Sequence, residues 1–346
     1  MSAVEFVTVG DDEAEQRVDR WLRKRISGLT QGQVEKLCRR GEVRVDGGRV
    51  KASTRVGPGQ VVRIPPIRMD PVRRPASDPA AQDPMPESLV QTLREAVIFM
   101  DDDLIALNKP PGLSVQGGTG QKQHVVGALP ALCFGKADPP RLIHRLDRDT
   151  SGVLLLARTG RAATALGQTF QRRSVEKIYF AAVAGVPKLA AGTIRYGLRK
   201  TVGRNNERME AVHPDEVQTT EEAKSAITEF AVVERAGSRL SWIALRPVTG
   251  RTHQLRVHMA QIGCPIAGDG KYGGRGQENL GDGWGGGLGG ALSRKLHLHA
   301  ARLSFDHPAK KEKVTISANL PTHMQRTWDV MGWDMTDWQD RTAWTD

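Results

Sequence analysis

The segment His144–Gly152, HRLDRDTSG, contains two aspartates, Asp147 and Asp149, with arginines beside them. Neighbouring arginines favour the ionised form of a carboxylate. An ionised aspartate held beside a strand can act as a nucleophile or as an electrostatic stabiliser. The apolar run VLLLA follows at once and predicts a buried strand. The same pattern also fits a salt-bridged turn with no chemical role.

The spacing of these acids is also close to that of a calcium-binding loop, with Asp147 at position 1 and Gly152 at position 6. Position 12 of such a loop is a bidentate glutamate. Here that position is Arg158, and the residues before it, 153–157, form an apolar run, so the sequence excludes calcium binding.

A second cluster, TGRTHQLRVH, spans Thr249–His258. Thr249 or Thr252 is expected to cap a helix that ends near Gly263. Arg251 at the helix start opposes the helix dipole, which is a weak indication of function. The alternative is an exposed helix start that binds a phosphate or nothing.

Histidines are the residues that could hold a metal, and their spacing argues against it. His253 and His258 are five residues apart, whereas a helical zinc pair needs four. His297 and His299 form an H-x-H pair with no third ligand. A metal-dependent hydrolase therefore fails on spacing. The chain also lacks a GxSxG elbow, a phosphate loop and a dinucleotide fingerprint, so we predict no metal and no cofactor.

The third candidate element is KIYF, which begins a predicted strand. Alternation along a strand places Lys177 and Tyr179 on the same face. A tyrosine in a strand is most often a packing residue, and this pattern alone does not distinguish packing from a functional role.

These residues must be positioned by a domain rich in strands. Strands are predicted at Val97–Met100, Leu104–Asn108, Val153–Ala157, Ile178–Ala184, Ile227–Val233 and Leu240–Leu245. Helices are predicted at Ala162–Gln171 and Thr252–Ile262. Many strands with few βαβ alternations predict an α+β domain on a mixed, mainly antiparallel sheet.

A small basic domain precedes it. Residues 16–66 hold 13 basic and 4 acidic residues, and so carry nine of the eleven net positive charges. Two helices are predicted, the second capped by Thr30 and ended by Gly41, and then a hairpin around an Asp-Gly turn. Arg39, Arg40 and Arg44 lie near the helix-to-hairpin junction and are candidate RNA-binding residues.

The remaining segments set the domain boundaries. Residues 65–86 contain seven prolines, which predict an extended linker. We place the first domain at 1–66, the linker at 67–88, the large domain at 89–323 and a tryptophan-rich tail at 324–346. Residues 268–290 contain 12 glycines and are expected to form a surface insertion.

Composition excludes several classes of protein. A hydrophobic fraction of 39% with 26% charged residues is typical of a globular chain, and no run reaches the 18 apolar residues that a membrane span needs. Three scattered cysteines, none in a CxxC, predict no disulfide framework and fit the cytoplasm. The basic charge favours a nucleic-acid partner.

Taken together, the motifs resemble the RluA-type pseudouridine synthases. The resemblance rests on HRLDRDTSG with NKPPGLSV, KIYFAAVAG, RTHQLRVHMAQIGCPIAGDGKY and LHLHAARLSF, in the family's order over most of residues 95–310. The N-terminal block resembles the S4-like RNA-binding domain, which often precedes this catalytic domain.

The resemblance assigns roles to particular residues. Asp147 matches the catalytic aspartate, Tyr179 a pocket tyrosine and candidate base, and Arg251 the arginine that pairs with the aspartate. Leu298 matches an apolar residue behind the pocket. Three further residues are assigned to the substrate pocket: Arg145, Leu146 and Lys177.

The implied function is the isomerisation of specific uridines to pseudouridine in RNA, without a cofactor, and large-subunit ribosomal RNA is the favoured substrate. We expect a cytoplasmic monomer with no membrane contact. The alternative is a non-catalytic protein that binds structured RNA through both domains.

Overall fold

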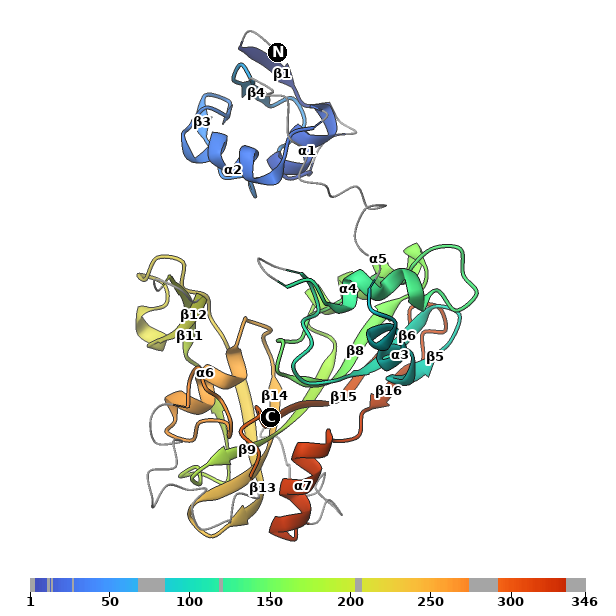
Figure 1. Ribbon diagram of the computed structural model, residues 1–346. Coiled ribbons are helices and arrows are strands. Elements are labelled where there is room, and N and C mark those ends of the chain that lie inside the picture. The colour runs from blue at the N-terminus through green and yellow to red at the C-terminus, as the bar shows by residue number, and fades with distance from the viewer. Residues whose placement is uncertain are drawn as a thin grey trace. The chain divides into compact units, whose positions relative to one another are not determined.

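The computed structural model describes residues 4–10, 13, 15–26, 28–67, 85–117, 121–202, 207–273 and 292–333 (Figure 1). The chain divides into two compact units, residues 1–83 and 84–346. This division falls inside the predicted linker 67–88, most of which lies outside the described residues. Within the described part of the chain, no helix is long and apolar enough to cross a membrane.

The N-terminal unit is a small sheet with two helices. Its elements are β1 (Glu5–Thr8), α1 (Val18–Arg25), α2 (Gln31–Arg39), β2 (Arg44–Val45), β3 (Gly48–Arg49) and β4 (Val61–Ile64). The strand order is β1-β4-β2-β3, all antiparallel. Both predicted helices and the hairpin are present. The strand β1 was not predicted, because its four residues carry little apolar alternation.

Local sequence explains how these elements begin and end. The Thr30 side chain accepts from the Gln33 backbone N–H and the Gln33 side chain accepts in return, which forms a capping box at the start of α2. Gly41, just beyond α2, has φ of 70°. Asp46 and Gly47 have φ of 48° and 77°, as a two-residue turn with positive φ at both positions requires.

The second unit is built on a ten-stranded sheet. The helices are α3 (Glu87–Glu95), α4 (Val125–Ala128), α5 (Gly160–Gln171), α6 (Gln254–Gln261) and α7 (Thr322–Met331). The strands are β5 (Val97–Met100), β6 (Leu104–Lys109), β7 (Arg141–Leu142), β8 (Ser151–Ala157), β9 (Glu176–Ala184), β10 (Ala191–Ile194), β13 (Thr228–Ala236), β14 (Leu240–Pro247), β15 (Leu298–Asp306) and β16 (Lys313–Ser317). A separate hairpin joins β11 (Gly197–Val202) to β12 (Glu207–Val212).

The order of the main path is β10-β13-β14-β9-β15-β8-β6-β5, and only β15 and β8 pair in parallel. The prediction of an α+β fold on a mixed, mainly antiparallel sheet is therefore confirmed. All seven residues of β8 are buried, since helices cover the sheet on both faces, and a strand buried on both faces is apolar throughout.

Two pairs of apolar clusters line the sheet. On one face, β6 and β8 pack against α3 and α4, while β9 and β14 pack against α6. On the opposite face, β6 and β8 pack against α5, and β9 and β14 pack against α7. Tyr179 of β9 contacts both clusters of the first face, so it marks the place where the two halves of the sheet meet.

Two predicted segments differ from what the structure describes. Residues 268–273, the start of the predicted insertion, include the buried Asp269 and Tyr272 and pack beside α6, whereas 274–291 lie outside the described residues. The predicted tail begins inside α7, whose Trp328 packs edge-on against Trp242 of β14 at 4.6 Å. The compact unit therefore continues to Trp333 at least.

Candidate active site

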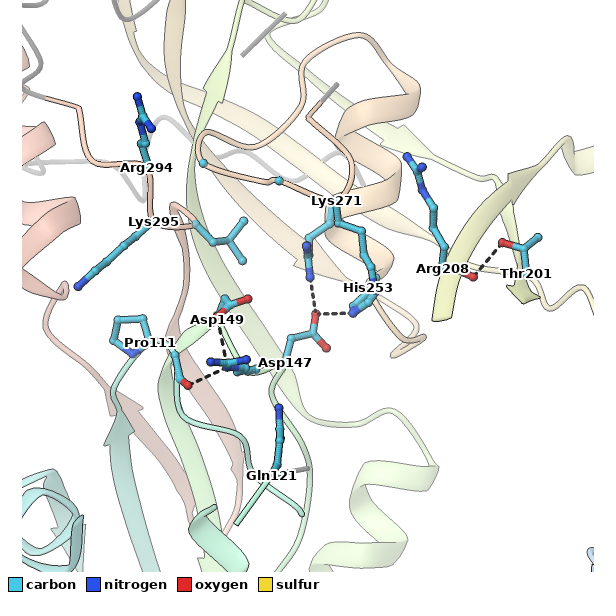
Figure 2. Close-up of a pocket in the computed structure, with 16 residues that line it drawn as sticks. Pro111, Gln121, Asp147, Asp149, Thr201, Arg208, His253, Lys271, Arg294 and Lys295 are labelled. Atoms are coloured by element: carbon cyan, nitrogen blue, oxygen red, sulfur yellow. Dashed lines mark hydrogen bonds and ion pairs between the residues drawn. The ribbon is translucent and has the colours of Figure 1, made fainter. Parts of the chain in front are cut away.

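Asp147 lies in the loop between β7 and β8, and its side chain is 29% exposed. Its Oδ2 atom is 3.9 Å from Nε2 of His253 and 3.9 Å from Nη1 of Arg256. Figure 2 shows the Asp147 carboxylate directed toward His253, with a dashed line for this contact. At 3.9 Å the contacts are electrostatic and too long for hydrogen bonds, so the carboxylate oxygens stay available to a substrate.

Arg256 is held by a different acid. Its Nε and Nη2 atoms each donate to Asp269 over 2.7 Å, a buried bidentate pair. Asp269 also accepts backbone N–H bonds from Lys271 and Tyr272. Burial acts to lower the pKa of Arg256, but the hydrogen bonds and charge of Asp269, with the charge of Asp147, raise it above its usual value. A fixed positive charge therefore stands beside Asp147.

The structure corrects the expected pairing of Asp147 with Arg251. Arg251 precedes α6, and its Nε donates to the Ser225 carbonyl at 3.1 Å; among the described contacts of Asp147, the arginine is Arg256. The physical reason lies in the start of the helix. The Gln254 side chain accepts from the Arg251 backbone N–H, so α6 begins after Arg251 and the first helical turn carries Arg256 inward.

The predicted threonine cap is also absent. His253 is the N-cap of α6, with φ of 53° and no capping bond from its side chain. A non-glycine residue with this left-handed backbone is uncommon, although histidine is among those that adopt it most often. Thr249 instead donates to the Gln254 side chain and accepts from the Ile227 N–H.

His253 is tied to Tyr272 by a 2.7 Å hydrogen bond at Nδ1. The Tyr272 hydroxyl already accepts from the Met209 N–H at 3.0 Å. This arrangement favours donation of the tyrosine proton to Nδ1, which leaves the imidazole proton on Nε2, facing Asp147. Burial lowers the pKa of His253, and the nearby Arg256 lowers it further against the opposing charge of Asp147. His253 is therefore neutral, and its Nε2 faces the carboxylate at 3.9 Å without a hydrogen bond.

Asp147 borders a cavity of about 630 Å³, called here the inner pocket. Its lining includes all seven predicted catalytic and pocket residues: Arg145, Leu146, Asp147, Lys177, Tyr179, Arg251 and Leu298. The sheet supplies the apolar floor, since Leu298 of β15 and Tyr179 of β9 are packed into it. Burial, together with the charge of Asp147, raises the pKa of the Tyr179 phenol. That shift keeps the proton on Tyr179 and disfavours the role of base that the resemblance gave it.

Lys177 stands at the rim of the inner pocket on an aromatic support. Its Nζ lies 4.9 Å from the centre of the Phe170 ring, and the His144 ring stacks on that phenylalanine at 4.9 Å. Burial lowers the pKa of Lys177. The same burial, with the charge of Lys177, lowers the pKa of His144 to about 3. Lys177 therefore lies over the Phe170 ring, on which the neutral His144 ring stacks.

A second hollow of about 1220 Å³ opens on the other side of Asp147 and is called here the basic groove. Its charged lining consists of six lysines or arginines and two acids: Arg148, Arg208, Arg256, Lys271, Arg294, Lys295, Asp147 and Asp149. Figure 2 shows Arg208 reaching it from β12, and Arg294 and Lys295 from the segment before β15. Asp147, His253 and Arg256 border both hollows.

Lys109 fastens the Asp147 loop to the end of β6. It is fully buried, and its Nζ donates to the carbonyls of Pro110 at 2.8 Å, Leu113 at 2.9 Å and Arg148 at 3.0 Å. Burial lowers the pKa of Lys109 to about 7, against the raising effect of Asp149 and Asp147. Three carbonyl acceptors match the three N–H bonds of the ammonium form, so the protonated form is the one that holds the loops together.

The candidate RNA-binding residues of the first unit lie at its surface. Arg39 and Arg40 are exposed, and Arg40 approaches Glu42 at 3.7 Å. Arg44 is half-buried and donates to the carbonyls of Gly41 and Gly47. Their role in RNA binding stays a prediction.

Metal ligation has no support in the described parts of the chain, where no cluster of three or more His, Cys, Asp or Glu side chains is placed to hold an ion. His297 and His299 are instead buried in structural hydrogen bonds, to Thr327 and to Ser151 respectively. That the reaction needs no metal or cofactor remains a prediction.

Comparison with known proteins decides the family. A family model described as RNA pseudouridylate synthase matches residues 103–261, and an S4 domain model matches residues 16–62. The ribosomal large subunit pseudouridine synthase C of Yersinia pestis is 36% identical over 322 residues, covering 93% of this chain and 94% of that protein. The chain belongs to the RNA pseudouridylate synthase family. The protein is thus an RNA pseudouridine synthase with an N-terminal S4 domain.

Other relatives are similar to this synthase in sequence or structure over most of its length. The Escherichia coli K12 protein of the same name is 36% identical over 324 residues, covering 94% of this chain and 95% of that protein. The human RNA pseudouridylate synthase domain containing 4 has a TM-score of 0.60 at 29% identity, over 72% of this chain and 97% of that one. The human domain containing 1 has a TM-score of 0.51 at 27% identity, over 65% and 83%.

Four residues around Asp147 were not predicted from the sequence of this synthase. They are His253, Arg256, Asp269 and Tyr272. All four lie in RTHQLRVHMAQIGCPIAGDGKY, so the motif contained the signal. Arg256 itself was a usable indication, because it lies in a predicted helix between the apolar residues Leu255 and Val257. A buried arginine is almost always paired with an acid, so this position indicates an acidic partner nearby.

Proposed function

We propose that this synthase converts uridines of large-subunit ribosomal RNA to pseudouridine, with Asp147 as the catalytic carboxylate. The substrate is suggested by the relatives, whose names specify the ribosomal large subunit. The role of Asp147 is supported above all by one observation: its carboxylate stands between the inner pocket and the basic groove, beside a fixed arginine and a neutral histidine.

The two hollows suit the two parts of a flipped nucleotide. A uridine turned out of the RNA stack needs an enclosed pocket for its base and a polar path for its backbone. The inner pocket has an apolar floor and a polar rim, and we assign the uracil to it. The basic groove supplies cations for the phosphates on either side. The ribose then lies at the boundary, where Asp147 stands.

The reaction detaches uracil from ribose, turns it and rejoins it through carbon 5. A carboxylate beside the sugar can stabilise or trap the electron-poor carbon that uracil leaves, as in glycoside chemistry. Arg256 places a positive charge 3.9 Å from Asp147, while its bonds to Asp269 keep it from approaching that carboxylate to hydrogen-bond distance. His253 turns its Nε2 toward the same carboxylate from 3.9 Å, close enough to act on it electrostatically but too far for a hydrogen bond.

Tyr179 is proposed to act in its protonated form. Its raised pKa suits an O–H that donates to a uracil oxygen, and its ring forms part of the pocket wall on which the base rests. Arg251, which also lines the inner pocket, is assigned to holding the flipped base in place.

The alternative of a non-catalytic RNA-binding protein is not supported, because the chain belongs to an enzyme family. We keep as expectations that the synthase is monomeric, cytoplasmic and independent of metals or cofactors.

The substitution Asp147→Asn tests the assignment. It preserves size and removes charge, and an amide oxygen is a poor nucleophile and a poor base. Release of label from carbon 5 of uridine in a large-subunit ribosomal RNA transcript should be abolished. Far-UV circular dichroism and RNA affinity should match the parent, because Asp147 makes no hydrogen-bonded ion pair in the described structure.

Asp149→Asn is the matched control, since this acid borders the same groove with a side chain that is 54% exposed. It should retain most activity. Turnover near the parental rate in the Asp147 variant would show that the assignment is wrong. Activity on transfer RNA but not on ribosomal RNA would leave Asp147 in place and overturn the proposed substrate.

A further inference from the structure

The sheet of the N-terminal unit carries one continuous row of side chains across its four strands. Phe6 of β1 lies opposite Arg63 of β4, Arg63 lies opposite Arg44 of β2, and Arg44 lies opposite Arg49 of β3. Residues directly opposite in a sheet project from the same face. Their strand neighbours Val62, Val45 and Ile64 are buried in the core, so the row is on the outer face.

No acid among the described residues of the unit forms an ion pair with the arginines of this row. Arg44 donates to the carbonyls of Gly41 and Gly47, and Arg63 donates to the Glu42 carbonyl at 2.6 Å. The carbonyl bonds fix the guanidinium groups of Arg44 and Arg63 in place but leave their positive charge uncompensated.

Such a row opposes folding. Like charges directly opposite one another in a sheet are destabilising, and here two such pairs follow each other across three strands. Phe6 adds a second cost, because its side chain is 69% exposed on an edge strand. Neither the paired like charges nor the exposed Phe6 ring stabilises the fold of the unit. Together they indicate a binding surface for a partner that is anionic and has flat apolar faces.

We propose that Phe6, Arg63, Arg44 and Arg49 form an RNA-binding platform, on which an unpaired base stacks on the Phe6 ring while the arginines contact the adjoining phosphates. This inference rests on the proposed function only in that the chain acts on RNA. Of the three junction residues predicted from the sequence it keeps Arg44, leaves out Arg39 and Arg40 on and next to α2, and adds Phe6, Arg63 and Arg49 of the sheet. Unpaired bases of RNA offer π-faces for stacking on aromatic side chains, whereas the bases of a duplex are already stacked.

The geometry also sets the order of contacts. Neighbouring strands are about 4.8 Å apart, so the four residues form a track about 14 Å long across the sheet. Phe6 stands at one end of this track and the three arginines follow it, so the phosphates that they contact lie to one side of the stacked base. The platform therefore fits a bulge or a loop at the end of a stem.

Binding of the full-length Phe6→Ala protein tests the platform. The probes are an RNA stem-loop with unpaired loop nucleotides and a fully paired RNA of the same length and charge. We expect affinity for the stem-loop to fall about 5- to 100-fold, the range found when a stacking aromatic is removed. Affinity for the paired RNA should stay within about twofold, because phosphate contacts remain.

Three further variants separate stacking from other effects. Phe6→Trp keeps a stacking face and should bind the stem-loop like the parent. Val61→Ala removes another exposed apolar side chain from the same face, and should bind both RNAs like the parent. Arg63→Gln should weaken binding of both RNAs and lower the salt slope by about one, since one phosphate contact is lost.

Parental stem-loop affinity in Phe6→Ala would overturn the platform, as would an equal loss for both RNAs. Its failure is distinguishable from failure of the proposed function. If Asp147→Asn is inactive while Phe6→Ala binds normally, only the platform is wrong. If Asp147→Asn turns over normally while Phe6→Ala loses stem-loop affinity, the platform stands and the catalytic assignment is wrong.

Discussion

At the scale of single residues, the site depends on how two carboxylates share one arginine. Asp269 is buried and accepts two hydrogen bonds from the Arg256 guanidinium at 2.7 Å. Asp147 lies 3.9 Å from Nη1 of the same arginine and interacts with it only electrostatically. A bidentate partner sets the position of a guanidinium more tightly than a distant charge does. Asp269 therefore positions Arg256, and Arg256 in turn sets the field at Asp147.

The substitution Arg256→Lys separates these two functions. Lysine keeps the positive charge but cannot form two parallel bonds with Asp269, so the cation moves relative to Asp147. We expect kcat to fall about 100-fold, as displacements of about 1 Å in an active site commonly cause. Steady-state kinetics of label release from carbon 5 measures it.

Arg251→Lys is the matched comparison, since this arginine contacts the Ser225 carbonyl at the edge of the inner pocket. It should raise KM and leave kcat within a few-fold. A larger fall of kcat in Arg251→Lys than in Arg256→Lys would restore the pairing first expected from the sequence.

At the scale of elements, the parallel contact of β8 with β15 brings the site together. Gly152 has φ of 109°, and a Cβ atom added there would lie 2.2 Å from the carbonyl oxygen of Ala300. In the same register, Ser151 and His299 form a 2.9 Å hydrogen bond. Because Leu298 begins β15, this close approach places the pocket floor next to the loop that carries Asp147.

Gly152→Ala should therefore be costly. The contact is with backbone atoms of β15, which cannot rotate away, and the positive φ adds strain to any side chain. We expect the free energy of unfolding in urea to fall by about 3 kcal/mol, with kcat reduced in parallel. Gly167→Ala is the control, because this residue lies inside α5 with nothing within 4 Å of an added Cβ. It should be neutral or stabilising by up to about 1 kcal/mol. Equal losses in both variants would contradict the close-approach argument.

At the scale of the whole molecule, buried neutral histidines link stability to pH. Burial lowers the pKa of His258, His297 and His299 to about 4 and that of His144 to about 3. All four belong to the second unit and face hydrogen-bond partners inside it. In the unfolded chain their pKa is about 6.5, so the unfolded state binds more protons than the folded state between about pH 4 and 6.5.

The contribution of these neutral histidines to the free energy of unfolding should therefore be fully present above about pH 6.5 and be lost as the pH falls toward 4. Each histidine contributes a slope of up to about 1.4 kcal/mol per pH unit in this window. Urea unfolding monitored by tryptophan fluorescence, between about pH 4.5 and 7.5, measures the slope. His299→Gln keeps one donor for the Ala318 carbonyl and one acceptor for Ser151, and should lower the slope by one histidine's share. An unchanged slope in that variant would contradict this account.

Local pattern alone determined much of this protein. Alternation predicted the central strands, and Val97–Met100 has the bounds that were predicted. Thr30 capped its helix as expected, because capping depends on residues three apart. The ordered motifs were sufficient for the family, since each holds several residues in sequence. The seven pocket residues could be named for the same reason, although their grouping around one cavity required the sheet.

Only the tertiary structure decided which side chains meet. Arg251 and Arg256 belong to the same motif, and the start of α6 after Arg251 selects Arg256 as the partner of Asp147. Asp269 was predicted to lie in a glycine-rich insertion, yet its burial beside α6 makes it the anchor of that arginine. The arginine row of the N-terminal sheet depends on strand register. Contacts between distant segments depend on packing and register, which no local spacing encodes.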